Sequence, residues 1–202
     1  MDEKRVDNLK QFGPKGNPFE KSRWIEERYA RQLRDVARQI QRIVSSHDPA
    51  TLSGLEAMQQ ALAQYAGILK PWAAKTAADV AKQLDAQDLA MWRRQSVKIG
   101  KKLREIVEQD PAGQAMREFV ERQVHYITSL PTEEGLRVQK LAQEARLGGK
   151  RPAEIAAQIE ATGHVSASRA TLIARTEIAR AGAVLTETRA QAIGATHYIW
   201  RT

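Results

Sequence analysis

The feature that most constrains the fold is a row of apolar residues that begins at Ile25. The row consists of Ile25, Tyr29, Leu33, Val36, Ile40 and Ile43, which follow one another at steps of three or four residues. This is the period of one face of an α-helix. Pro18 suits the first position of such a helix, because its missing N–H is not needed there, and Asn17 can cap it. The pattern predicts a long amphipathic helix from Pro18 onward.

The composition favours a core of packed helices. The chain has 202 residues but only three Phe, four Tyr and four Trp, so its core must consist mainly of Ala, Leu, Ile and Val. Helical spacing recurs from Thr51 to Pro71, where proline is expected to break or kink the helix. It recurs again from Met116 to Ile127, in a helix expected to end at "SLP", residues 129–131.

The predicted fold is mainly α, with an extended multi-helix N-terminal region followed by a compact helical module that ends in a short β-strand. Residues 1–16 are predicted to be an extended arm, because "QFGPKGNP" holds two Gly and two Pro. Residues 17–130 form the helical region and residues 131–202 the module. Within the module we expect one helix stopped by Gly148-Gly149 and a short helix around "PAEIAAQIEATG". A long helix follows, capped by Ser166 or Ser168 and stopped by Gly194.

The C-terminal "THYIWRT" alternates in the manner of a strand, with Tyr198 and Trp200 on one side. The chain contains no Cys, which excludes disulfides and thiolate metal sites and fits a reducing cytoplasm or a particle assembled in one. The first residues lack an apolar signal core, and no run of about 18 apolar residues occurs. We therefore expect a soluble protein with no membrane partner.

Basic residues are concentrated in one segment of this chain of net charge +8. They are Arg93, Arg94, Lys98, Lys101, Lys102 and Arg104, with no acidic residue among them. On a helix these six cover about half the circumference, opposite Trp92, Ile99, Leu103 and Ile106. The basic face is either an ordinary solvated surface or a contact for the phosphates of double-stranded DNA or for an acidic partner. The absence of an aromatic residue on this face argues against stacking of single strands.

One glutamate lies where a surface charge is not expected. In "LIARTEIARAG", Glu177 falls within the apolar arc of a helix, whereas Arg175 falls outside it. The arc consists of Ala170, Ile173, Ala174, Ala181, Val184 and Leu185. A buried carboxylate is costly unless it is paired, so we expect Glu177 to pair with Arg180, or with His197 or Arg201 if the strand packs across the helix. A catalytic role and direct contact with a partner are the alternatives.

Catalytic constellations are not found in the sequence. His47, His125, His164 and His197 lie far apart and show no metal-ligand spacing. "RLGGKRP" lacks the spacing of a phosphate-binding loop and is interpreted as a turn between helices rather than a phosphate contact through Lys150 and Arg151. One carboxylate without a nucleophile, second acid or metal cluster does not make an active site. We expect no catalysis, no metal and no cofactor.

The last 75 or so residues resemble the Mu F-like minor head morphogenesis proteins of tailed bacteriophages. The similarity is carried by "SLPTEEGLRVQKLAQEARLGGKRPAEIAAQIEATG", "RATLIARTEIARA" and "AQAIGATHYIW". Its most specific positions are Ala174, Arg175, Thr176, Glu177 and Arg180 on the helix, with Gly194, Tyr198 and Trp200 in the strand segment. Family members usually continue into a segment with an Asp, an Arg and a His, whereas this sequence stops at Thr202, which raises truncation as an alternative.

The resemblance implies a minor capsid protein, present in few copies in the procapsid and associated with the portal vertex. Its implied partners are the portal protein, the major capsid protein or both, and some relatives bind DNA. Its implied location is the virion, assembled in the cytoplasm of the bacterial host. We expect docking mainly through residues 17–130, whose amphipathic helices offer the larger surface. A second hypothesis is that the protein binds DNA without sequence preference through residues 93–104. A third hypothesis is that the module is fused to an enzyme or toxin domain, but the chain is too short to contain one.

Overall fold

The structure is a computed structural model that describes residues 18–99, 112–148 and 152–194. Within these ranges the elements are four helices: α2 (Pro18–Ser45), α3 (Leu52–Ile99), α5 (Gly113–Leu147) and α6 (Pro152–Ala192). The described residues contain no strand, so the prediction of a mainly α fold is confirmed. The predicted arm at 1–16 and the predicted strand at 195–202 lie outside the described ranges.

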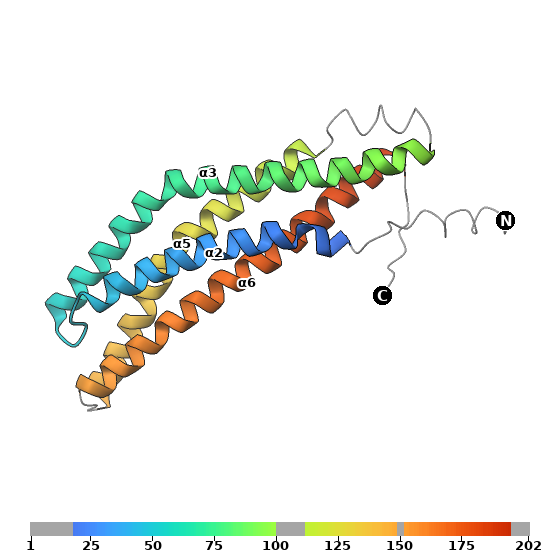
Figure 1. Cartoon of the computed structure of the whole chain (residues 1–202). Coiled ribbons are helices and arrows are strands. Elements are labelled where there is room, and N and C mark those ends of the chain that lie inside the picture. The colour runs from blue at the N-terminus through green and yellow to red at the C-terminus, as the bar shows by residue number, and fades with distance from the viewer. Residues whose placement is uncertain (1–17, 100–111, 149–151, 195–202) are drawn as a thin grey trace.

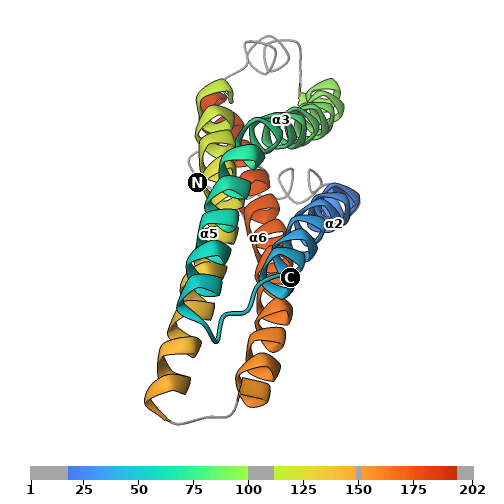
Figure 2. The same ribbon diagram turned by 90° about the vertical axis from the view of Figure 1, so that its left-hand side faces the viewer.

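The four helices form an elongated bundle in which successive helices alternate in direction. Figures 1 and 2 show α2 beside α6 and α3 beside α5. Two contacts fix the antiparallel register of α3 and α5, since Gln59 bonds to Gln139 and Leu62 lies against Gly135. The connections between helices are short or lie outside the described residues. This is the up-down-up-down topology of a four-helix bundle.

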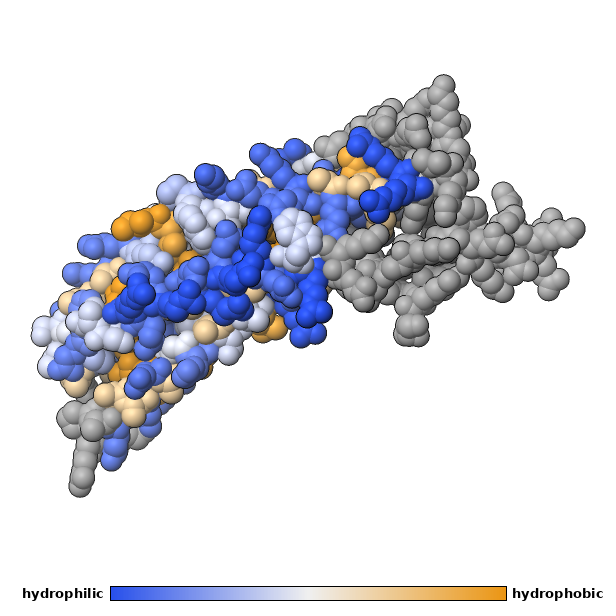
Figure 3. Space-filling view, viewed as in Figure 1, coloured by the Kyte–Doolittle hydropathy of each residue, from blue (hydrophilic) through white to orange (hydrophobic). Residues whose placement is uncertain are grey.

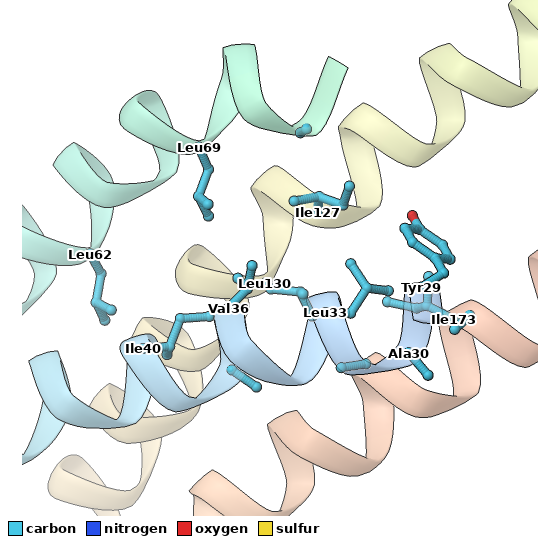
Figure 4. Close-up of a cluster of buried hydrophobic side chains, with 14 of the residues drawn as sticks. Tyr29, Ala30, Leu33, Val36, Ile40, Leu62, Leu69, Ile127, Leu130 and Ile173 are labelled. Atoms are coloured by element: carbon cyan, nitrogen blue, oxygen red, sulfur yellow. The ribbon is translucent and has the colours of Figure 1, made fainter. Parts of the chain in front are cut away.

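The predicted apolar stripe of α2 lies in the core of the bundle. Five of its residues, Ile25, Tyr29, Leu33, Val36 and Ile40, are buried, as Figure 4 shows for four of them. At the sixth position the helix buries Val44, whereas Ile43 is only partly buried. The helix starts at Pro18 as predicted, and Asn17 lies outside the described residues.

Helix α3 begins where its sequence predicts. The backbone N–H of Gly54 donates to Oγ1 of Thr51 at 3.1 Å, so Thr51 caps the helix. A side chain at Gly54 would meet the carbonyl oxygen of Asp48 at 2.0 Å, which restricts this position to glycine. Pro71 does not break the helix, which continues to Ile99 and bends along its length in Figure 1. Burial of Leu69 and Ala73 on either side of the proline offsets the lost hydrogen bond.

The predicted end of a helix at residues 129–131 is wrong, because α5 runs through Pro131 to Leu147. Ile127 and Leu130 before the proline and Val138 after it are fully buried in one core. The cost of an internal proline, about 3 kcal/mol, is smaller than the gain from burying these apolar side chains. The boundary placed between residues 130 and 131 therefore lies inside a helix and a shared core. The stop at Gly148 is confirmed, since α5 ends one residue earlier.

The separate short and long helices predicted after Pro152 are also wrong, because α6 is one helix of 41 residues. Gly163 lies within it, and Ser166 is a fully buried side chain in mid-helix rather than a cap. Helix propensity at these positions is overridden by packing against α2 and α5. The predicted stop is confirmed: α6 ends at Ala192, and Gly194 adopts φ 77°, a left-handed conformation that favours glycine.

The core contains one large apolar cluster to which all four helices contribute. Figure 4 shows Leu62 and Leu69 of α3, Ile127 and Leu130 of α5, and Ile173 of α6 around the stripe of α2. A small second cluster surrounds Trp92 near the C-terminal end of α3. No helix among the described residues is long and apolar enough to cross a membrane.

Candidate functional site

The motif that carries the family resemblance lies in the middle of α6. Its apolar arc faces the core as predicted: Ala170, Ile173, Ala174, Ala181 and Leu185 are buried, and Val184 is half-buried. Glu177 lies in the same arc and is only 4% exposed. Arg175 and Thr176, the neighbours before it, are exposed. The motif therefore presents its carboxylate inward and its first two polar side chains outward.

Glu177 is bound by donors from two helices. Nε2 of Gln123 on α5 donates to Oε2 of Glu177 at 2.8 Å, and Nε of Arg122 approaches the same oxygen at 3.5 Å. Arg180, one turn later on α6, lies 3.9 Å from Oε1. The predicted pairing with Arg180 is confirmed, but it is the longest of the three contacts. The close partner, Gln123, was not predicted from the sequence.

The contact network of Glu177 continues to α2. The hydroxyl of Tyr29 donates to Oε1 of Gln123 at 2.9 Å, so one buried amide connects a phenol and a carboxylate. Burial raises the pKa of Tyr29 far above its usual range, and the nearby charge of Glu177 raises it further. We refer to Tyr29, Gln123 and Glu177 as the Glu177 network. It ties α2, α5 and α6 together in the core.

A second buried carboxylate, Glu134, lies at the same interface of α5 and α6. Its side chain is fully buried and accepts hydrogen bonds from Thr162, Ser166 (2.6 Å) and Arg137 (3.0 Å). Arg137 also donates to the hydroxyl of Ser166 at 2.7 Å. This cluster explains why Ser166 and Thr162 lie in mid-helix without ending it: both hydroxyls are used by a carboxylate of the neighbouring helix.

A third polar cluster joins α3 to α6 near the smaller apolar cluster. Arg189 is 1% exposed, and its guanidinium bonds to Asp88 and, at 2.5 Å, to Asp85. Thr186 donates to the other oxygen of Asp88 at 3.1 Å. Burial raises the pKa of the Asp88 carboxyl, and the bond from Arg189 opposes that effect. A buried arginine held by two carboxylates fixes the register of the two helices.

Each cluster contains a polar residue that lies in the apolar phase of its helix, a pattern that was interpreted above only for Glu177. In α5, Gln123 and Glu134 fall in phase with the buried positions Phe119, Ile127, Leu130 and Val138. In α6, Arg189 follows Ala181 and Leu185 at steps of four residues. A polar residue in the apolar phase of a helix predicts a buried, bonded side chain. Applied throughout, this rule identifies Gln123, Glu134 and Arg189 as buried residues, although it does not name their partners.

The basic segment is described only in part. Arg93 and Arg94 are exposed on the last turns of α3, and Trp92 is buried on the opposite side as predicted. The backbone of Lys98 is helical, but its side chain is not described, and Lys101, Lys102 and Arg104 lie outside the described residues. Tyr198 and Trp200 also lie outside them.

The arrangement is that of a scaffold with buried polar clusters. Among residues 18–99, 112–148 and 152–194 no group of three or more His, Asp or Glu side chains is placed to hold a metal ion. Comparison with known proteins adds no relative: no family model, no curated protein and no solved structure matches the chain. Function must therefore be inferred from the residues themselves.

Proposed function

We propose that the chain is a minor head protein of a tailed bacteriophage, a structural component that acts at the portal vertex and catalyses no reaction. It binds the portal protein, the major capsid protein or both during procapsid assembly in the bacterial cytoplasm, and it remains in the virion. The resemblance of the α6 motif to Mu F-like head morphogenesis proteins is the basis of this proposal.

The observation that best supports this proposal is that Glu177 is buried and hydrogen-bonded. This carboxylate is the most distinctive residue of the motif, and it is buried with hydrogen-bond donors from α5 and α6 around it. A residue engaged in this way stabilises the bundle and is not presented to a substrate. An assembly protein needs such a rigid scaffold, because its function depends on the surfaces that the scaffold holds in place.

The docking surface is proposed to lie mainly within residues 17–130. Fragments cut at residue 130 cannot test this, because the cut would divide α5 and the core. Exposed apolar side chains of the intact chain offer a better test. Leu52 and Ile68 are 66% and 72% exposed in the N-terminal half, and Leu136 and Leu172 are 65% and 59% exposed in the other half.

The experiment is co-sedimentation of the intact protein with purified portal oligomers of the phage that encodes it. The variant Leu52→Gln/Ile68→Gln should bind at least tenfold more weakly than the wild type. The matched control Leu136→Gln/Leu172→Gln should bind normally. Binding lost only in the control pair would move the docking surface to the C-terminal half. No binding by the wild-type protein to the portal or to capsid protein would remove the proposed function.

DNA binding through residues 93–104 remains the alternative function, supported by the exposure of Arg93 and Arg94. Replacement of Lys98, Lys101 and Lys102 by Glu should weaken binding equally for all duplex sequences, since phosphate contacts carry no sequence information. Duplex binding that is unchanged in this triple variant would exclude the segment as the contact.

A further inference from the structure

The exposed face of α2 carries a row of arginines that the sequence analysis did not single out. The row consists of Arg31, Arg34, Arg38 and Arg42, which at 100° per residue fall within about 80° of the helix circumference. Arg34 is half-buried and the other three are exposed. We call these four residues the α2 arginine row. In Figure 3 the most hydrophilic side chains form a band over this part of the molecule.

The carboxylates on the same face do not neutralise the row. Glu27 pairs with Arg23 at 2.9 Å, and Asp35 pairs with Arg38. Arg31, Arg34 and Arg42 make no ion pair with any carboxylate that the structure describes. The described contacts of Arg34 and Arg42 are to neutral groups, the Thr171 hydroxyl at 3.3 Å and the side-chain amide oxygen Oε1 of Gln39 at 3.4 Å. Among the described side chains, three guanidinium groups of the row therefore have no carboxylate partner.

Helix α6 extends this positive surface. The bond from Arg34 to Thr171 and the contact of Gln41 with Gly163 set α6 antiparallel to α2. Arg175 lies one turn beyond Thr171 and is exposed, so it adds a further cation beside the row. Between Glu160 and Glu177, α6 has no acidic residue. The surface formed by the two helices thus contains few negative charges along this length.

We propose that the α2 arginine row, with Arg175, is a docking surface for the phosphate backbone of duplex DNA. All six basic residues among the described side chains of α2 are arginines, whose planar guanidinium groups match phosphate oxygens in bidentate geometry. The row extends about 16 Å along the helix, from 1.5 Å of rise per residue. That length corresponds to about five phosphates of one strand at about 3.4 Å each.

The surroundings of the row favour a duplex over a single strand. The exposed aromatic residue on this part of α2 is Trp24, and the guanidinium of Arg28 lies 5.6 Å from its ring centroid. A platform for single strands needs several aromatic rings open for base stacking. The row offers charge without such rings and no pattern of groups for reading base edges, so binding is independent of sequence. This surface is separate from residues 93–104 and does not depend on portal binding.

The test is duplex DNA binding by the intact protein over a salt series. The variant Arg31→Gln/Arg42→Gln/Arg175→Gln removes three exposed charges that have no described carboxylate partner. The matched control Lys70→Gln/Lys75→Gln/Lys82→Gln removes three exposed charges from α3. The arginine variant should lose at least tenfold in affinity at low salt, and its slope of log K against log salt should be reduced by about 2–3, at about 0.9 per lost contact. The control should keep the wild-type slope.

Three results would overturn the proposal. The first is no duplex binding by the wild-type protein at low salt. The second is an equal loss in both triple variants, which would show that only net charge matters. The third is displacement of the duplex by polyglutamate as efficiently as by unlabelled DNA per unit charge, which would assign the surface to acidic proteins. Unchanged thermal unfolding of both variants would establish that each one is folded.

Discussion

Replacement of Glu177 by Leu is the most informative perturbation of the core, because the residue is bonded within a buried chain of polar groups. The change leaves Nε2 of Gln123 without its acceptor at 2.8 Å, and Gln123 is fully buried. An unsatisfied buried donor costs about 1–3 kcal/mol. The ion pairs with Arg122 and Arg180 add little, since both arginines are partly exposed and screened by solvent. We expect Glu177→Leu to lower the free energy of unfolding by about 2–3 kcal/mol.

Two further variants distinguish the stability lost with one member of the Glu177 network from the stability lost with the whole network. Glu177→Gln keeps an acceptor oxygen for Gln123 and loses the charge, so it should cost about 1–2 kcal/mol. The triple variant Tyr29→Phe/Gln123→Leu/Glu177→Leu removes every member of the Glu177 network and leaves none of them orphaned. Replacement of a whole buried polar group by apolar residues of similar size is often nearly neutral. The free energy of unfolding of the triple variant should therefore lie within about 1 kcal/mol of the wild-type value.

The assay is urea unfolding followed by circular dichroism, with the midpoint and the slope measured for each variant. If the three residues act as one bonded network, the stability changes of their substitutions must be strongly non-additive, and the triple variant must be more stable than Glu177→Leu alone. If Glu177→Leu is as stable as the wild type, or if the three substitutions add up to a larger loss, then Glu177 is not a bonded core residue. Direct contact with a partner would then be the better explanation of its position.

Three other predictions concern the remaining polar residues of the core. Since burial raises the pKa of Tyr29, its contribution to stability is fully present below the ordinary tyrosine pKa of about 10 and is lost as pH rises above it; Tyr29→Phe should reduce this alkaline loss in thermal unfolding. Arg189→Met leaves the buried Asp88 without its cation and should cost about 3–5 kcal/mol in urea unfolding, with Asp88→Asn/Arg189→Met recovering part of it. Glu134→Ala should cost about 3–5 kcal/mol, because it leaves the buried Ser166 hydroxyl without its acceptor and opens a cavity, whereas Glu134→Gln should cost about half as much; equal effects would contradict the role of the charge.

The sequence predicted the helices better than it predicted where they end. The stripe from Ile25 to Ile40 and the helix start near Thr51 were predicted correctly, because both depend on neighbours within about one turn. The interruptions expected at Pro131 and Gly163 did not occur. Local propensity is worth at most about 3 kcal/mol at such positions, and burial of side chains on both sides exceeds it.

The partners of the buried polar residues could not be predicted for a different reason. Gln123 and Glu177 are 54 residues apart, and their contact depends on the register of α5 against α6. A sequence pattern shows that a carboxylate is buried but does not show which helix supplies its donor. Arg180 was the nearest candidate in sequence, and the shortest bond came instead from another helix. The α2 arginine row was missed because its charges alternate in sequence with core residues.

The proposed role of this protein as a structural part of a phage head requires that it be present in purified particles. Quantitative mass spectrometry of gradient-purified procapsids and virions from the phage that encodes it would count the copies per particle. We expect a small, constant number of copies relative to the portal protein, and loss of the protein from heads assembled without portal. Absence of the chain from purified procapsids and virions, with the protein recovered only from the soluble lysate, would contradict it.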